Sequence, residues 1–318
     1  MPQFSRLPVG FQSGGSHCAA WHYPGDNGAC IVMAPGGGVT KEPGTDRFAA
    51  RFQEAGFSVL AFDFRHFGGS EGRPRQVIRP RAQLEDLKAA IHYAATLPEV
   101  VPNRIAAWGF SLAGGHVMRL AASVKLAAAI AQTPFVDGLA STPNALRHET
   151  VSVVLRFPFI ALSDVLRTAA GRSPRLIPLA GPRGTVAMLT TPDAVDGGRA
   201  LDPNGRYEGW SQQVAARSAL RLGTYRPGQA ASKVRCPLLV VVAAGDQSVL
   251  AAPAQRAAER APDATVLTVP GGHYAPFLEQ HDEVVDAEIA FLANHLLEPP
   301  KGAPRDPNST AGEDVSRT

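Results

Sequence analysis

The sequence is poor in cysteine, and this shortage excludes several classes of protein. Its 318 residues include only three cysteines, Cys18, Cys30 and Cys236. They are too few and too scattered for a disulfide framework, and none forms the C-x-x-C pair that is typical of zinc and redox sites. We therefore expect a protein of the reducing cytoplasm that uses no metal and no cofactor.

Net charge is also small. The 31 basic and 28 acidic side chains give a formal net charge of +3, and they are spread along the chain. A protein that binds nucleic acid normally concentrates its basic residues in one patch or stripe. The overall charge therefore indicates neither a nucleic acid nor an anionic membrane as a partner.

Long apolar runs are scarce as well. No stretch approaches the roughly 18 apolar residues that a membrane-spanning helix needs. The first six residues, Met-Pro-Gln-Phe-Ser-Arg, lack the charged-then-apolar order of a secretory signal. Residues 298–318 combine Pro, Gly, Ser, Asp and Lys with almost no large apolar side chain, which predicts a disordered tail. We expect a soluble protein without a membrane span.

The chain does contain a regular alternation of strand-like and helix-like segments. Short runs rich in Val, Ile, Leu and Phe predict strands buried on both faces, at residues 29–34, 57–64, 105–108, 126–131 and 238–244. Helix-length segments lie between these strands, at residues 45–55, 83–95, 113–123 and 252–260. This alternation predicts an α/β fold, with right-handed crossovers and a mostly parallel sheet covered by helices on both faces.

The alternation stops between residues 135 and 232. This stretch is irregular and rich in proline, and residues 152–170 are its best helix candidate. The strands before and after it read as consecutive elements of one core, so the stretch predicts an inserted, mainly helical cap. We expect residues 1–134 and 233–297 to form the core and residues 135–232 the cap.

Ser111 is the strongest candidate for a catalytic residue. It lies at a sharp turn between a predicted strand and a predicted helix, in Gly109-Phe110-Ser111-Leu112-Ala113. A nucleophile elbow needs small residues two before and two after its serine, because the strained turn brings backbone segments close together. Gly109 and Ala113 meet this need, although glycine is usual at the second position. The alternative is an ordinary turn in which Ser111 caps the helix.

Five segments in a fixed order make the sequence similar to the α/β-hydrolase superfamily. They are Ala-Pro-Gly-Gly-Gly at 34–38, Phe-Asp-Phe-Arg-His-Phe-Gly-Gly-Ser at 62–70, the elbow, Ala-Gly-Asp at 244–246 and Gly-Gly-His at 271–273. More narrowly, the chain resembles the dienelactone-hydrolase and X-Pro-dipeptidyl-peptidase-like group. The resemblance implies the α/β-hydrolase fold and a triad whose members follow the order serine, acid, histidine.

His273 is the predicted general base. A serine at neutral pH needs a base to take its proton, and a carboxylate must hold that base in the right tautomer. His273 follows an apolar run and two glycines, where the family places its base. His116 lies five residues beyond Ser111 on the same predicted helix and should point away from it. His66 follows a strand and could line the pocket.

Two aspartates compete for the role of the acid. Asp246 closes the most convincing strand of the second half of the chain, which puts its carboxylate at the active-site edge of the sheet. Asp137 follows an earlier strand, and some family members take their acid from that position. Asp246 could instead be a turn aspartate bonded to its own backbone. We favour Asp246 and keep Asp137 as the alternative acid.

The oxyanion hole is predicted from two loops. One donor should be the backbone N–H of Leu112, directly after the serine. The family register assigns the second donor to Gly37, within a run of three glycines. This run fails both the G-x-G-x-x-G and the Walker pattern, so nucleotide binding is not expected. Further candidates for the pocket are Gly36, Phe110 and Trp210.

Together these residues predict a serine hydrolase that cleaves an ester, a thioester or a lactone, and less readily a peptide, through an acyl-Ser111 intermediate. Serine at the elbow argues against epoxide hydrolases and haloalkane dehalogenases, which use an aspartate there. Acyl transfer to an acceptor other than water would use the same intermediate and is the alternative. The remote alternative is a non-catalytic binding protein that has the same fold. The expected partner is a small acyl compound, and homodimer formation stays open.

Overall fold

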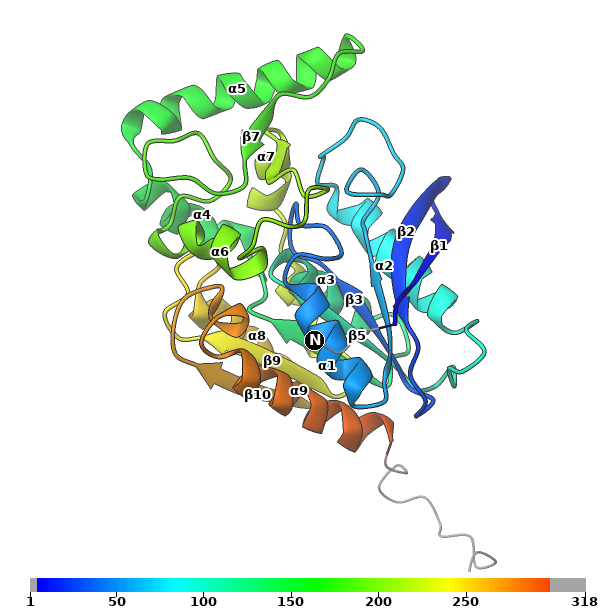
Figure 1. The fold of residues 1–318 in the computed structure, drawn as a ribbon. Helices are drawn as coiled ribbons and strands as arrows, with labels where there is room; N and C mark the ends of the chain where they lie inside the picture. Colours follow the sequence, from blue (N-terminus) through cyan, green and yellow to red (C-terminus); the bar gives the residue numbers. More distant parts are fainter. Residues whose placement is uncertain (1–4, 298–318) are drawn as a thin grey trace, which may run out of the picture.

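A central sheet of eight strands organises the molecule (Figure 1). The computed structural model describes residues 5–297, and the tail predicted at 298–318 lies outside the described residues. The strands of the sheet are β1 (Leu7–Ser13), β2 (Ser16–Tyr23), β3 (Cys30–Ala34), β4 (Ser58–Phe62), β5 (Ile105–Phe110), β6 (Ala128–Gln132), β9 (Leu238–Ala243) and β10 (Ala264–Val269).

The strand order is β1-β2-β4-β3-β5-β6-β9-β10. All pairs from β4 to β10 are parallel, whereas β1 pairs antiparallel with β2 and β2 antiparallel with β4. Every residue of β3, β4, β5, β6 and β9 is buried, which explains their unbroken apolar runs. The predicted mostly parallel α/β sheet is confirmed.

The antiparallel hairpin of β1 and β2 has no counterpart in the sequence prediction. Its strands alternate buried and exposed side chains and contain few large apolar residues. Gly14 and Gly15 form the turn between them with φ values of 51° and 77°, a region that glycine enters at little cost. Such an edge hairpin gives a weak signal because only part of its surface is buried.

Helices cover both faces of the sheet, as predicted. One face packs against α1 (Thr45–Glu54) and α9 (His281–Leu296), and the core there includes Phe48 and Leu292. The other face packs against α2 (Pro80–Ala94), α3 (Leu112–Ala121) and α8 (Ala251–Arg260), with Leu87 and Val117 in its core. The sheet thus separates two hydrophobic cores.

Between β6 and β9 the chain leaves the sheet and forms a separate group of short elements (Figure 1). Its longest helix, α5, occupies the segment predicted as a helix and lies farthest from the sheet. The last element, η2, packs against α3 and α8 of the core. The elements are α4 (Gly138–Arg147), α5 (Val151–Ala169), β7 (Leu176–Pro178), η1 (Pro192–Asp196), α6 (Gly197–Leu201), β8 (Gln213–Ala215), α7 (Ser218–Gly223) and η2 (Pro227–Lys233).

Residues 5–297 contain no helix that combines the length and the apolar character needed to cross a bilayer. Over the same residues, no three His, Cys, Asp or Glu side chains are grouped so that they could hold a metal ion. The three cysteines are buried as free thiols, and burial raises the pKa of Cys236 to about 11. These thiols are therefore protonated at neutral pH.

Candidate active site

Ser111 lies at a strained turn between β5 and α3. Its backbone angles, φ 55° and ψ −117°, are ones that a serine rarely adopts, and strain of this kind clusters at functional sites. A Cβ at Gly109 would lie 2.4 Å from the carbonyl oxygen of Ala113. Glycine is therefore required at position 109, whereas position 113 has room for the methyl group of Ala113, which is fully buried.

The structure brings the three predicted triad residues into hydrogen-bond contact. Nε2 of His273 lies 2.9 Å from Oγ of Ser111, and Nδ1 of His273 lies 2.7 Å from Oδ2 of Asp246. The other carboxylate oxygen of Asp246 accepts hydrogen bonds from the backbone N–H groups of Ser248 and Val249, each at 2.9 Å. Each carboxylate oxygen of Asp246 therefore has a partner.

The parallel sheet explains why residues so distant in sequence meet. Ser111, Asp246 and His273 follow β5, β9 and β10, whose carboxyl ends lie at one edge of the sheet. The loops after β9 and β10 are joined by a hydrogen bond of 2.8 Å from the N–H of Gly245 to the carbonyl of Gly271. This bond holds Asp246 and His273 at a fixed separation.

Asp137 has a different environment and no hydrogen bond to His273. Its carboxylate caps α4 by accepting from the N–H of Ala140 and forms an ion pair of 2.9 Å with Arg226. Burial by itself would raise the pKa of Asp137, but the Arg226 guanidinium and the Ala140 N–H outweigh this effect and lower the pKa. The geometry gives Asp137 a role at the start of a helix.

Asp193 is a residue that the sequence analysis missed. It lies in η1, and one carboxylate oxygen accepts from the N–H groups of Gln247 at 2.9 Å and His273 at 3.1 Å. The other oxygen accepts from the hydroxyl of Ser248 at 2.9 Å. Burial opposes ionisation of Asp193, yet the hydrogen bonds from Gln247 and His273 dominate and lower its pKa. An ionised carboxylate thus joins the loops that carry Asp246 and His273.

The two loops predicted for the oxyanion hole lie side by side. A Cβ at Gly37 would be 3.2 Å from the side chain of Leu112, and both residues line the same cavity as Ser111. Within the described part of the chain, no hydrogen bond joins the N–H of Gly37 or that of Leu112 to an acceptor. Two backbone donors are therefore available close to Ser111.

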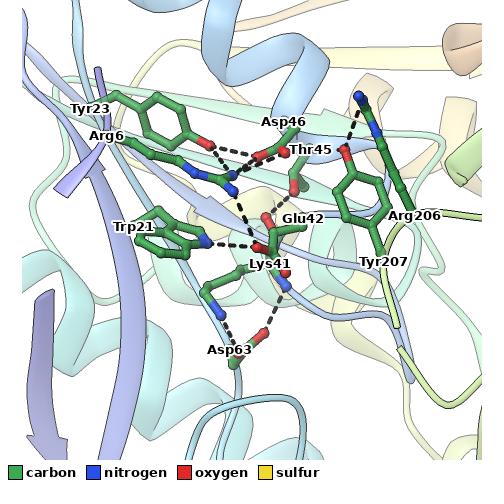
Figure 2. A network of polar contacts seen from close by, with 10 residues as sticks. All are labelled: Arg6, Trp21, Tyr23, Lys41, Glu42, Thr45, Asp46, Asp63, Arg206 and Tyr207. Atoms are coloured by element: carbon green, nitrogen blue, oxygen red, sulfur yellow. Dashed lines mark hydrogen bonds and ion pairs between the residues drawn. The ribbon is translucent and has the colours of Figure 1, made fainter. Parts of the chain in front are cut away.

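The glycine loop is fixed from several sides. Nε1 of Trp210 donates to the carbonyl of Gly38 at 3.0 Å, and this tryptophan is 8% exposed. Farther along the loop, Lys41 places its backbone N–H 2.7 Å and its ammonium group 2.8 Å from the two carboxylate oxygens of Asp63 (Figure 2). The loop is thus held by the segment between β6 and β9 on one side and by the end of β4 on the other.

Figure 2 shows how the polar network continues beyond this loop. Arg6 and the hydroxyl of Tyr23 bind the carboxylate of Asp46 in α1, at 2.8 and 2.6 Å. The hydroxyl of Tyr207 donates to the same carboxylate at 3.0 Å. Because Tyr207 belongs to the segment between β6 and β9, this contact ties that segment to the core.

Two of the residues considered for the pocket lie elsewhere. His66, with a φ of 78°, stabilises the turn after β4, where its N–H bonds the carbonyl of Glu71 and its ring lies against Gly72. Burial together with nearby arginines lowers the pKa of His66 to about 4. Gly36 packs against the ring of Phe110. Neither His66 nor Gly36 lines the cavity, whereas Phe110 and Trp210 do.

His116 points away from Ser111, as its position on the helix predicts. Its ring nitrogens bond the hydroxyl of Tyr225 at 2.7 Å and the side chain of Gln83 at 3.1 Å. The ring is completely buried, which lowers the pKa of His116 to about 3. It is therefore a neutral core histidine.

A cavity of about 810 Å³ opens above Ser111. Its floor contains Ser111, Leu112 and Gly37, and most of its wall comes from the segment between β6 and β9. The wall is mainly apolar and includes Val153, Phe157, Leu179, Met188, Leu201 and Trp210. The size is that of a small-molecule site, and the lining favours apolar groups.

Comparison with known proteins gives the family. The sequence pattern of the Alpha/beta hydrolase family matches residues 31–287. The chain belongs to the alpha/beta hydrolase family. It is 38% identical over 291 residues to the quorum-quenching protein AidA of Acinetobacter baumannii (strain MDR-ZJ06), covering 90% of this chain and 94% of AidA. The predicted superfamily is confirmed, and the chain is an enzyme of the α/β-hydrolase class.

The chain is also similar to a fungal protein named grgF, in sequence and in structure. The chain is 32% identical over 168 residues to the polyketide transferase grgF of a Penicillium species, covering 52% of this chain and 54% of that protein. The crystal structure of the α/β-hydrolase GrgF from Penicillium sp. sh18 matches with a TM-score of 0.77 at 22% identity, over 92% of this chain and all of that one. At this identity the match supports the fold.

Proposed function

We propose that this α/β-hydrolase cleaves an acyl bond in a small molecule (an ester, a thioester or a lactone) through a covalent acyl-Ser111 intermediate. The main observation behind the proposal is that Ser111, His273 and Asp246 are joined in a chain of hydrogen bonds at a strained elbow. A serine in such a chain is activated because its proton has an acceptor within 2.9 Å. Gly37, Leu112 and the cavity supply the remaining parts of the site.

The first step is acylation. Nε2 of His273 accepts the proton of Ser111 while Oγ attacks the acyl carbon, and Asp246 stabilises the imidazolium that forms. The N–H groups of Gly37 and Leu112 donate to the oxygen that becomes negative. One such donor typically lowers the barrier by about 3–4 kcal/mol. His273 then gives its proton to the leaving group, which departs as an alcohol or a thiol and, in a lactone, stays attached through the acyl chain.

The second step returns the enzyme to its starting state. Water attacks the acyl-Ser111 carbonyl, with His273 taking a proton from the water and passing it back to Ser111. In this proposal residues 135–232 act as a cap that holds the apolar part of the acyl group over Ser111. The quorum-quenching function of the relative from Acinetobacter baumannii, as its name gives it, is compatible with a small-molecule substrate. Membership of the dienelactone-hydrolase and X-Pro-dipeptidyl-peptidase-like group stays a prediction.

Labelling tests the nucleophile. A fluorophosphonate probe followed by peptide mapping should modify Ser111, and Ser111→Ala should lower kcat on p-nitrophenyl acyl esters by about 10³-fold or more. Ser141→Ala is the matched control, because Ser141 also lines the cavity and is buried. Label on another residue of an active preparation, or full activity of Ser111→Ala, would contradict the proposal.

Acyl transfer is the second candidate, and the name of the Penicillium relative favours it. The acyl-enzyme would be the same, with an alcohol or amine replacing water as the acceptor. The test adds alcohols or amines of increasing size to the enzyme during ester turnover and measures the ratio of transfer product to free acid. Hydrolysis predicts a ratio that follows acceptor concentration only, whereas a transferase shows saturation by one class of acceptor.

A further inference from the structure

Helix α5 is apolar on two opposite faces, and the structure covers one of them. The inner face is buried and includes Val153, Ile160 and Ala161. The outer face carries Val151, Leu155, Phe159, Leu162, Val165 and Leu166, and we call these six residues the α5 outer face. Their exposed fractions range from 41% to 76%. A contiguous exposed apolar patch of this kind marks a surface that contacts another surface.

Exposed arginines border the α5 outer face. Arg156 and Arg167 are eleven residues apart, which places them on the same flank of the helix. Nη1 of Arg175 donates to the hydroxyl of Ser163 at 3.3 Å, and Ser163 lies between them on that flank. Arg147, Arg172 and Arg183 are exposed nearby in the sequence. Among the described residues, no carboxylate forms an ion pair with any of these six arginines.

Acidic side chains do not offset this charge. The stretch 147–184 contains two carboxylates, Glu149 and Asp164. Glu149 is half-buried and accepts from Thr190, and Asp164 is fully buried and paired with Arg217 at 3.0 Å. The small net charge of the whole chain therefore conceals a basic, apolar region on α5.

We propose that the α5 outer face binds the surface of an anionic lipid bilayer. A row of exposed Val, Leu and Phe side chains beside arginines is typical of helices that lie in the plane of the interface. The apolar side chains enter the acyl region, and the arginines extend to the lipid phosphates. Pairing with a second copy is less favourable, because it would bring two basic regions together without exposed carboxylates to neutralise them.

Docking in this orientation gives α5 two functions. Its inner residues, among them Val153, Val154 and Phe157, form part of the cavity wall, while its outer residues contact the lipid. The enzyme would then work at a surface where apolar acyl compounds accumulate. The membrane contact itself goes beyond the proposed hydrolysis and holds whether or not Ser111 is the nucleophile.

Vesicle flotation tests the proposal on the full chain. We expect the protein to float with vesicles that contain phosphatidylcholine and one third phosphatidylglycerol, and only weakly with phosphatidylcholine alone. Leu155→Ser combined with Phe159→Ser should lower the bound fraction about tenfold or more. Arg156→Gln combined with Arg167→Gln should weaken binding about fivefold per arginine. Val266→Ser, an exposed apolar position on β10, is the matched control and should bind like the unaltered chain.

Three outcomes would overturn the proposal. The first is that the protein binds neither kind of vesicle, and the second is that binding does not depend on the phosphatidylglycerol content. The third is that the protein does not bind vesicles and forms a dimer in light scattering that the Leu155 and Phe159 substitutions dissociate. Leu155 and Phe159 do not line the cavity. Their variants should therefore keep the unfolding midpoint and the turnover of a short soluble ester, which separates loss of membrane binding from loss of the fold or of catalysis.

Discussion

Asp137 and Asp246 both follow a parallel strand, and their neighbours distinguish them. Asp246 is 7% exposed and shares its carboxylate between His273 and two backbone N–H groups. Asp137 is committed to Arg226 and to the first turn of α4. From their sequence positions both were candidates for the acid, because each lies at the active-site edge of the sheet. The partner of each carboxylate favours Asp246 as the acid.

The first prediction compares these two aspartates. Asp246→Asn should lower kcat by about 10³–10⁴-fold, because the amide cannot hold His273 in the productive tautomer. Asp137→Asn should change kcat less than about threefold and lower the free energy of unfolding by at most about 1 kcal/mol through loss of the ion pair with Arg226, because asparagine caps a helix about as well as aspartate. Steady-state kinetics and urea unfolding measure the two effects. If Asp137→Asn proved the more damaging to kcat, the choice of Asp246 would be wrong.

At the scale of elements, the short helix η1 links the loops that carry Asp246 and His273. Through Asp193 it bonds the backbone of Gln247, after β9, and of His273, after β10. A Cβ at Gly272 would lie 2.8 Å from Cβ of Asp193, so the loop approaches η1 as closely as glycine permits. A segment outside the sheet therefore helps to position Asp246 and His273.

We predict that Asp193 acts through this positioning. Asp193→Ala should lower kcat by about 10²-fold, as expected when reacting groups shift by about 1 Å, and leave KM nearly unchanged. Asp193→Asn keeps an acceptor oxygen and should restore part of the lost kcat. Asp196→Asn, at the exposed end of η1, is the control. A rise in KM with unchanged kcat would instead assign Asp193 to substrate binding.

At the scale of the whole molecule, the sheet separates two hydrophobic cores. One of these cores contains a buried pair of polar side chains. Nε1 of Trp108, in β5, donates to Oε2 of Glu288, in α9, at 3.0 Å. Both side chains are fully buried, and Oε1 of Glu288 has no partner among the described residues. Burial raises the pKa of Glu288 well above its ordinary value of 4.5.

The pH dependence of stability follows from this shift. The native state binds the Glu288 proton more tightly than the unfolded state, so the stabilisation is fully present below pH 4.5 and is lost as pH rises through the native pKa. Glu288→Gln imitates the protonated form and should raise the free energy of unfolding at pH 8 by about 1–3 kcal/mol. Below pH 4.5 the gain should vanish. Glu283→Gln, exposed on the same helix, should show neither effect in urea unfolding measured across this range.

The sequence by itself determined the elements whose residues are buried on both faces. The strands β3, β5 and β9 contain unbroken apolar runs because no side of them meets water. It also indicated Ser111, since an elbow restricts the size of its own neighbours and leaves a local pattern. The order in which the family places its triad predicted Asp246 and His273 as the partners of Ser111.

The tertiary structure decided what depends on contacts between distant residues. Asp193 accepts hydrogen bonds from backbone N–H groups that lie 54 and 80 positions away in the sequence. No local sequence pattern indicates such contacts. The segment Thr-Thr-Pro-Asp that ends at Asp193 is typical of an ordinary loop. The turn role of His66 and the exposure of the α5 outer face were hidden for the same reason. Periodicity marks a helix as apolar, but only packing shows which apolar face is left uncovered.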